Sequence, residues 1–284
     1  MKIMSFNVCS KDTWGVNLQT KEKWNLWKNY FKEIIVYNSP DIVFLQEVYI
    51  IENYIEDLRQ TLGSEWNVFY TNVPGLNKNL NNAIFFKIAC LDISEKYLQH
   101  QSVHKNCQVI KIQTKSKNIV GVNVHFKSDI NSVIVPGSEH EKDLIHLCKL
   151  LNQLKLDYPE ALIFAAGDFN YSYDLIYKYQ LFQELLHRWI LDDPNTQREG
   201  PALTTLKVDG SMGNCMDHFI YNEYAASLIE KQDFNNEDIK WNFTLGVLHL
   251  DKGARFLLEK TELSPIDYFY NISDHFPIVT EINC

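Results

Sequence analysis

The chain has 284 residues, of which 45% are hydrophobic and 13% aromatic, so it can bury a sizeable core and is not a disordered protein. Its net charge of −9 argues against a protein that holds nucleic acid mainly through bulk positive charge. No run of about 20 apolar residues occurs, so we expect no transmembrane segment.

The first half of the chain begins with alternating strand and helix patterns. Residues 1–8 predict a strand, and residues 20–37 predict a helix because their large apolar residues recur at helical spacing. Residues 41–48 form a compact apolar run after a proline, which is typical of a buried strand. Residues 51–62 return to helical spacing before Gly63, a residue type that often ends helices. Further strands are expected at 66–71, 82–88, 108–114 and 119–126.

The second half contains two more helical patterns. They span residues 139–156 and 174–187, with a short buried strand at 161–165 between them. Strands are also expected at 215–221 and 277–282. Many strands, some consecutive and some separated by helices, predict an α/β (α+β) fold with two packed sheets covered by helices. Because nothing marks an internal boundary, we expect a single domain over residues 1–284.

Polar residues stand where apolar strands should simply continue or stop. Taken singly, such a residue usually caps a turn or faces solvent. Here several strand ends carry carboxylates, amides or a histidine, and strand ends at one edge of a sheet are a common place for a site. The sequence therefore predicts that these residues assemble one. The set comprises Asn7, Gln46, Glu47, Asp168, Asn170, Asp217, Asp274 and His275.

The residue types in this set indicate phosphoester chemistry. Magnesium prefers oxygen ligands and uses one or two carboxylates, a role that suits Glu47 and Asp274. No His/Cys cluster has zinc-ligand spacing, so zinc is the weaker choice. His275 could take a proton from water if a carboxylate oriented its ring, and Asp217 is the candidate for that carboxylate.

Two short segments place polar residues two positions apart, on one face of an extended chain. Asp168 and Asn170 are two residues apart, so in extended chain their side chains point the same way. One could orient water or stabilise a leaving oxygen while the other donates to a phosphoryl oxygen. Asn123, His125 and Lys127 likewise alternate onto one face, and a histidine with a lysine could neutralise a phosphate in the transition state.

Positive charge is concentrated in one stretch. Residues 96–128 contain six lysines and no acidic residue. One interpretation is a pair of strands with a lysine-lined solvent face. The other is a local attraction for an anionic substrate.

The order of these motifs resembles the endonuclease/exonuclease/phosphatase superfamily, which has the DNase-I-like fold. The matching segments are SFNV, LQEV, NVHF, GDFN, MDHF and SDHFP, and they run from residue 5 to residue 277. The resemblance implies a four-layer sandwich, with two mixed β-sheets face to face and helices outside. It also implies a divalent metal ion, usually Mg²⁺ with Mn²⁺ as a substitute, and in-line attack by water on a phosphate ester.

The resemblance also implies a role for each matching residue. Glu47 is the expected metal carboxylate, with Asn7 beside the metal and the scissile phosphate. Asp274 is the expected second acid on the metal side. Asp217 and His275 resemble an Asp–His pair, while Asp168, Asn170 and His125 resemble residues around the attacked phosphate. Either His275 or Asp168 could activate the water.

The chain departs from each branch of the superfamily, so no branch is assigned. His125 stands where AP-endonuclease-like members usually have tyrosine. GDFNYS lacks the arginine of the inositol polyphosphate 5-phosphatase motif, and MDHF replaces its later C-D-R motif. His218 replaces the tyrosine of the generic branch, which includes DNases, deadenylases and sphingomyelinases.

Three functional hypotheses are compatible with this pattern. The first is a metal-dependent phosphodiesterase that acts on nucleic acid. The alternative is a phosphatase or sphingomyelinase-type phosphodiesterase that acts on inositol phosphates, phosphoinositides or phospholipid head groups. The third is a non-catalytic binding protein on the same fold.

The cellular setting is inferred from the cysteines and from the first motif. Six cysteines contain no CxxC pair, so we expect free thiols in a reducing compartment. The strand that carries Asn7 begins almost at Met1, which leaves no room for a cleavable leader. We therefore expect a protein that is cytoplasmic or exported without a cleaved N-terminal signal. We also expect a monomer.

Overall fold

The computed structural model describes most of the predicted strands and three helices. The described residues are 1–8, 21–48, 54–70, 81–87, 90–93, 107–113, 118–126, 135–172, 175–176, 179, 189–191, 205, 216–222, 273 and 275–281.

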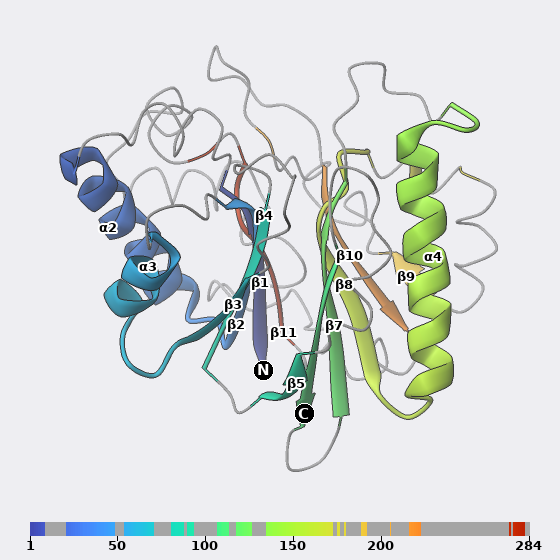
Figure 1. Cartoon of the computed structure of the whole chain (residues 1–284), viewed down its shortest axis with the longest axis horizontal. Coiled ribbons are helices and arrows are strands. Elements are labelled where there is room, and N and C mark those ends of the chain that lie inside the picture. Colours follow the sequence, from blue (N-terminus) through green and yellow to red (C-terminus); the bar gives the residue numbers. More distant parts are fainter. Residues whose placement is uncertain are drawn as a thin grey trace, which may run out of the picture.

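Two β-sheets form the centre of the fold (Figure 1). In spatial order, sheet A contains β11 (Ile278–Glu281), β1 (Lys2–Asn7), β2 (Ile42–Val48), β4 (Asn81–Phe86) and β3 (Asn67–Tyr70). Sheet B contains β5 (Cys90–Ile93), β6 (Gln108–Gln113), β7 (Asn118–His125), β8 (Leu162–Asp168), β10 (Asp217–Asn222) and β9 (Trp189–Leu191). Both sheets are mixed, because β1 and β2 run parallel in sheet A, β7 and β8 run parallel in sheet B, and the other pairs are antiparallel.

Helices cover the outer face of each sheet (Figure 1). On sheet A lie α2 (Lys21–Asn38) and α3 (Tyr54–Leu62), whose buried residues pack with those of β1, β2 and β4. On sheet B lies α4 (Glu139–Asp157), which begins at the N-cap Ser138, whose side chain accepts from the Glu141 N–H. The four layers are helix, sheet, sheet and helix, which confirms the predicted sandwich. Of the helices that the structure describes, none has the length and apolarity needed to cross a membrane.

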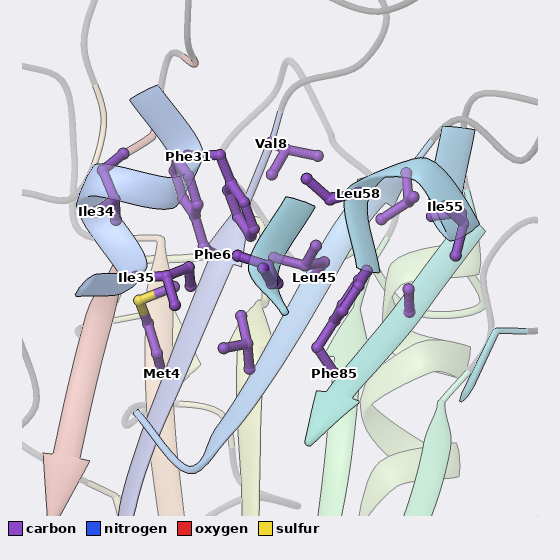
Figure 2. Close-up of a cluster of buried hydrophobic side chains, with 14 of the residues drawn as sticks. Met4, Phe6, Val8, Phe31, Ile34, Ile35, Leu45, Ile55, Leu58 and Phe85 are labelled. Atoms are coloured by element: carbon purple, nitrogen blue, oxygen red, sulfur yellow. The ribbon is translucent and has the colours of Figure 1, made fainter. Parts of the chain in front are cut away.

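Three buried clusters hold these layers together. One lies between sheet A and its helices, where Figure 2 shows Phe31 of α2 beside Phe6 of β1, with Phe85 of β4 further along the same cluster. The equivalent cluster on sheet B packs α4 against alternate residues of β7 and β8. The third fills the space between the sheets, and its centre is the stacked pair Phe44 and Phe164, with ring centroids 5.6 Å apart. Each sheet is therefore buried on both faces, which explains its nearly continuous apolar strands.

The predicted elements agree with the structure apart from the shortest ones. Predicted strands and helices in the described ranges appear with ends shifted by a few residues, and β8 extends to Asp168, beyond the predicted end at 165. The structure adds β5 and β9, edge strands of four and three residues that are too short to show a periodic pattern. The predicted helix at 174–187 lies almost entirely outside the described residues. Cys107 and Cys148 are free thiols, as expected. Both are buried, and burial raises the pKa of each thiol to about 12.

Candidate active site

The face between the two sheets changes character along the strands. On β1, Ile3, Ser5 and Asn7 point towards sheet B, because the intervening Met4 and Phe6 pack against the helix side. The same alternation gives Ile119, Gly121, Asn123 and His125 on β7. Apolar side chains thus occupy the middle of this face, and polar side chains gather at one end of the sandwich.

Sheet B presents three polar residues side by side in one row. Asp168 at the end of β8 is the register partner of His125 on β7 and of Asp217 on β10. All three are buried to 99%. Gly167, with φ of 152°, allows this close packing, because a Cβ there would lie 1.9 Å from the Val124 carbonyl oxygen.

Sheet A contributes Glu47 through a local irregularity in β2. Between Leu45 and Val48, β2 advances three residues while β4 advances two, and Glu47 has a φ of 57°. Regular alternation would place Glu47 on the helix side with Leu45. The extra residue gives that position to Val48 and turns Glu47 towards the site.

The side chains of the two sheets meet around Asp168. Asn7 Nδ2 donates to Asp168 Oδ2 at 2.8 Å and lies 3.4 Å from Glu47 Oε1. His125 Nε2 lies 3.4 Å from Glu47 Oε1 and 3.8 Å from Asp168 Oδ2. His275 Nε2 lies 3.9 Å from the same Asp168 oxygen.

His275 is held by an acid and by its own backbone. Its Nδ1 lies 2.9 Å from Asp217 Oδ2, the pairing expected from the sequence. Its backbone N–H donates to Ser273 Oγ, which in turn donates to the Asn7 carbonyl oxygen at 2.6 Å. Thr205 pairs with His275 through an isolated β-bridge. Ser273 and Thr205 were not expected, since neither stands at the end of an apolar run.

Asn170 lies beside Asp168 for a reason that differs from the predicted one. The chain is not extended there, because Asn170 has a φ of 53°. The turn brings the Asn170 N–H to 2.7 Å from Asp168 Oδ1 and its Nδ2 to 2.9 Å from Oδ2. Nδ2 also donates to the Phe126 carbonyl oxygen at 2.8 Å. Asn170 thereby orients Asp168, and its contact with phosphate stays a prediction.

Two predicted site residues, Lys127 and Asp274, lie outside the described residues. Of the lysine-rich stretch, the structure describes Lys111, whose Nζ contacts the Tyr158 hydroxyl group at 3.1 Å and lies over the Tyr158 ring. Tyr158 caps the C-terminal end of α4 on the outer face of sheet B. Lys111 therefore points away from the site, and its charge supports the solvent-face interpretation of this stretch.

His218 is a buried structural residue next to Asp217. It lies on the α4 side of β10, where its Nε2 donates to the Tyr171 carbonyl oxygen at 2.7 Å. Burial lowers the pKa of the imidazole to about 4, against the smaller opposing effect of that hydrogen bond. His218 is therefore neutral at pH 7 and takes no part in the cluster around Asp168.

The described side chains offer two groups of metal ligands. Glu47, His125 and Asp168 form one, and Asp168, Asp217 and His275 form the other, with candidate ligand atoms within 4.8 Å of one another in each group. The first group provides two carboxylates beside the amide of Asn7, and carboxylate and amide oxygens are ligands that fit Mg²⁺ and Mn²⁺. In the second group, Asp217 already binds the His275 ring.

Nearly the whole chain matches one protein family. The profile of the Endonuclease/Exonuclease/phosphatase family aligns with residues 4–275. That range includes every predicted site residue. Among curated protein sequences, none matches this chain.

Solved structures share the fold at low sequence identity. Truncated TDP2 from Caenorhabditis elegans is 15% identical, with 98% of this chain and 95% of that chain covered and a TM-score of 0.61. TDP2 from D. rerio in complex with a single-strand DNA product is 15% identical, with 100% and 99% covered and a TM-score of 0.60. The 3'-5' exonuclease NExo from Neisseria meningitidis is 15% identical, with 100% of both chains covered and a TM-score of 0.56.

Proposed function

The chain belongs to the endonuclease/exonuclease/phosphatase family, and from this membership we propose that it is a divalent-metal-dependent phosphodiesterase that acts on nucleic acid. The coarser activity, hydrolysis of a phosphoester bond, is that of the family. The metal, the substrate and the roles of individual residues are the proposed part.

One observation carries the proposal, namely the meeting of a metal-binding group and a proton acceptor at Asp168. On one side, the Glu47 and Asp168 carboxylates are both within 3.4 Å of Asn7 Nδ2. On the other side, His275 Nε2 lies 3.9 Å from Asp168 Oδ2. Water and a phosphate ester bound here would touch both groups.

Glu47 and Asp168 would hold the metal ion, with Asn7 beside it. Asp274, directly before His275 in the chain, stays the predicted second acid on the metal side. When bound, a divalent ion supplies positive charge against the phosphate and the leaving oxygen. The Glu47 side chain is 18% exposed and that of Asp168 only 1%, so solvent would reach the bound metal from the Glu47 side.

His275 is the better placed of the two candidate bases. Asp217 accepts the Nδ1–H, so the neutral ring carries its lone pair on Nε2, the atom that faces Asp168. Nε2 takes the proton of the attacking water, and Asp217 stabilises the resulting imidazolium. Asp168 already accepts hydrogen bonds from Asn7 and twice from Asn170, which suits a fixed ionised carboxylate rather than a proton carrier.

His125 would act on the phosphate together with Lys127. Its Nε2 faces the gap between Glu47 and Asp168, at 3.4 Å and 3.8 Å from their oxygens. From there the ring could donate to a phosphoryl oxygen as negative charge develops. Lys127, two residues further on, would add a positive charge.

A nucleic acid substrate is the lead proposal because D. rerio TDP2, which shares the fold, is complexed with a single-strand DNA product. The net charge of −9 does not oppose this, since the metal ion can bridge local phosphate contacts. The lipid and inositol phosphate alternatives use the same chemistry at the scissile bond, so a substrate panel has to separate them.

The test is hydrolysis by the purified chain in Mg²⁺. The panel contains end-labelled single-stranded DNA, duplex DNA and RNA, together with inositol phosphates, phosphoinositides and sphingomyelin vesicles. We expect cleavage of at least one nucleic acid, lost in EDTA and in His275→Ala. Intact nucleic acids combined with phosphate or phosphocholine release would transfer the function to the alternative class. A folded chain that hydrolyses nothing in the panel would support the non-catalytic hypothesis.

A further inference from the structure

A layer of buried polar side chains lies directly beneath the candidate site. It separates the site from the apolar centre of the space between the sheets. Each member is at most 2% exposed. The layer consists of Ser5, Gln46, Asn82, Gln108 and Asn123.

The hydrogen bonds of this layer cross from one sheet to the other. Gln46 Nε2 in sheet A donates to Asn123 Oδ1 in sheet B at 2.7 Å and to Ser5 Oγ at 3.0 Å. Asn123 Nδ2 lies 3.1 Å from the Leu45 carbonyl oxygen and 3.2 Å from the Ala83 carbonyl oxygen, both in sheet A.

Gln108 adds one more inter-sheet bond, from its Nε2 to the Asn82 carbonyl oxygen at 2.9 Å. Its Oε1 lies 3.1 Å from Asn123 Nδ2 within sheet B. Asn123 is therefore the centre of the layer, with contacts to β2, β4 and β6. Buried hydrogen bonds between two sheets favour one arrangement of the elements they join.

The amide of Gln46 is paired at its nitrogen but, among the described residues, not at its oxygen. Its side chain is fully buried, and within the described part of the chain Gln46 Oε1 has no hydrogen-bond partner. Burying an unpaired amide oxygen is unfavourable. Methionine would avoid that cost, but it would leave the buried Asn123 Oδ1 without the Gln46 donor. What the amide contributes is therefore its pair of hydrogen bonds, one of which joins the two sheets.

Members of the layer are only one or two residues away from site residues in the chain. Gln46 is followed at once by Glu47, Asn123 stands two residues before His125, and Ser5 two residues before Asn7. A fixed Gln46–Asn123 bond therefore fixes the ends of β2 and β7, from which Glu47 and His125 extend to within 3.4 Å of each other.

We propose that Gln46 and Asn123 are positioning residues, and that their inter-sheet hydrogen bond sets the spacing between Glu47 on one sheet and His125 and Asp168 on the other. Neither residue touches the reacting atoms. The inference rests on the proposed function, because it assigns the layer to the metal-binding side of that site.

The experiment compares two inter-sheet hydrogen bonds, one beneath the candidate site and one near the other end of the sandwich. Gln46→Met removes the bond beneath the site. Tyr221→Phe removes the bond from the Tyr221 hydroxyl group to Thr280 Oγ1, at 3.0 Å, near the other end of the sandwich. Three properties of each variant are measured. Calorimetry gives the Mn²⁺ affinity, hydrolysis of bis(p-nitrophenyl) phosphate gives kcat and KM, and urea unfolding gives the unfolding midpoint.

We expect Gln46→Met to weaken Mn²⁺ binding and to lower kcat, each by about 10- to 100-fold, with KM changed by less than about threefold. Tyr221→Phe should leave Mn²⁺ affinity, kcat and KM within about threefold of the wild-type values, even if its unfolding midpoint falls as far as that of Gln46→Met. If Gln46→Met does not fold, Ser5→Ala, which removes one acceptor of the same amide, should show the same pattern at smaller size. Unchanged Mn²⁺ affinity and kcat in a folded Gln46→Met, or equal losses in Tyr221→Phe, would overturn the proposal.

A readout without metal or substrate separates this inference from the proposed function. Backbone hydrogen exchange at Glu47 and His125, followed by NMR, should be faster in Gln46→Met than in Tyr221→Phe. A wild-type chain that binds no metal and hydrolyses no phosphoester would end the proposed function. Slow exchange at both amides in Gln46→Met would end the positioning role, whatever the activity.

Discussion

His275 Nδ1 lies 2.9 Å from Asp217 Oδ2, although the two residues are 58 positions apart in the chain. Asp217 begins β10 of sheet B, whereas His275 stands just before β11 of sheet A. The pair therefore joins the two sheets at the site, and it exists only when both sheets are packed together.

Replacing either partner of this pair should have a large effect on turnover. Asp217→Asn and His275→Gln should each lower kcat by about a hundred- to ten-thousandfold, because the first removes the acid that orients the proposed base and the second removes that base. The double variant should lose little more than the worse single one, since the two side chains act as a unit. The measurement is kcat on bis(p-nitrophenyl) phosphate at saturating Mg²⁺. His218→Gln, next to Asp217 but outside the cluster, is the control, and equal loss there would contradict the assignment.

Glu47→Gln should weaken metal binding while leaving the fold intact. The substitution keeps the shape but removes a negative charge that lies 18% exposed at the site. We expect Mn²⁺ affinity to fall by at least about tenfold, and activity to need correspondingly more metal. Calorimetry measures the affinity, and Glu141→Gln at the start of α4 is the control. EDTA should abolish wild-type activity, and added Mg²⁺ or Mn²⁺ should restore it.

Gly167→Ala should damage both stability and activity. Its Cβ would lie 1.9 Å from the Val124 carbonyl oxygen, so β7 and β8 would have to separate beside His125 and Asp168. Backbone strain at φ of 152° adds roughly 1–3 kcal/mol to the cost. Gly137→Ala is the matched control, because Gly137 also has a positive φ, of 80°, but within the described part of the chain no atom lies within 4 Å of the position that its Cβ would take. Urea unfolding of the two variants should rank Gly167→Ala well below Gly137→Ala.

Stability should fall in mild acid because of His218. The folded state lowers the pKa of this imidazole from its usual 6.5 to about 4, so between these values the unfolded chain binds more protons. The contribution of neutral His218 to stability is therefore fully present above about pH 6.5 and is lost as the pH falls towards 4. At pH 5 the loss amounts to about 2 kcal/mol relative to pH 7. Urea unfolding at both pH values checks this, and the difference should shrink in His218→Gln, which cannot titrate.

Most of the fold was predictable because both sheets are buried on two faces. Continuous apolar runs such as 41–48 and the helical stripe of α2 mark their elements without tertiary information. The short edge strands β5 and β9 were missed because three or four residues are too few to show periodicity.

The composition of the candidate site could be predicted from the sequence, but its geometry could not. Asn7, Asp168 and Asp217 stood out because a polar residue at the end of an apolar strand is unusual. The turn at Asn170, with its φ of 53°, and the bulge that redirects Glu47 were not predicted, because they involve partners distant in the chain: the Phe126 carbonyl oxygen for Asn170 and strand β4 for the bulge.

The sequence by itself determined which residues are polar in an otherwise apolar strand, and therefore which side chains a buried site could use. Only the tertiary structure decided that these side chains come from two sheets and meet at Asp168. The physical reason is that alternation along a strand depends on neighbouring residues, whereas the distance from Glu47 to His125 depends on how the sheets pack and on the amides that join them.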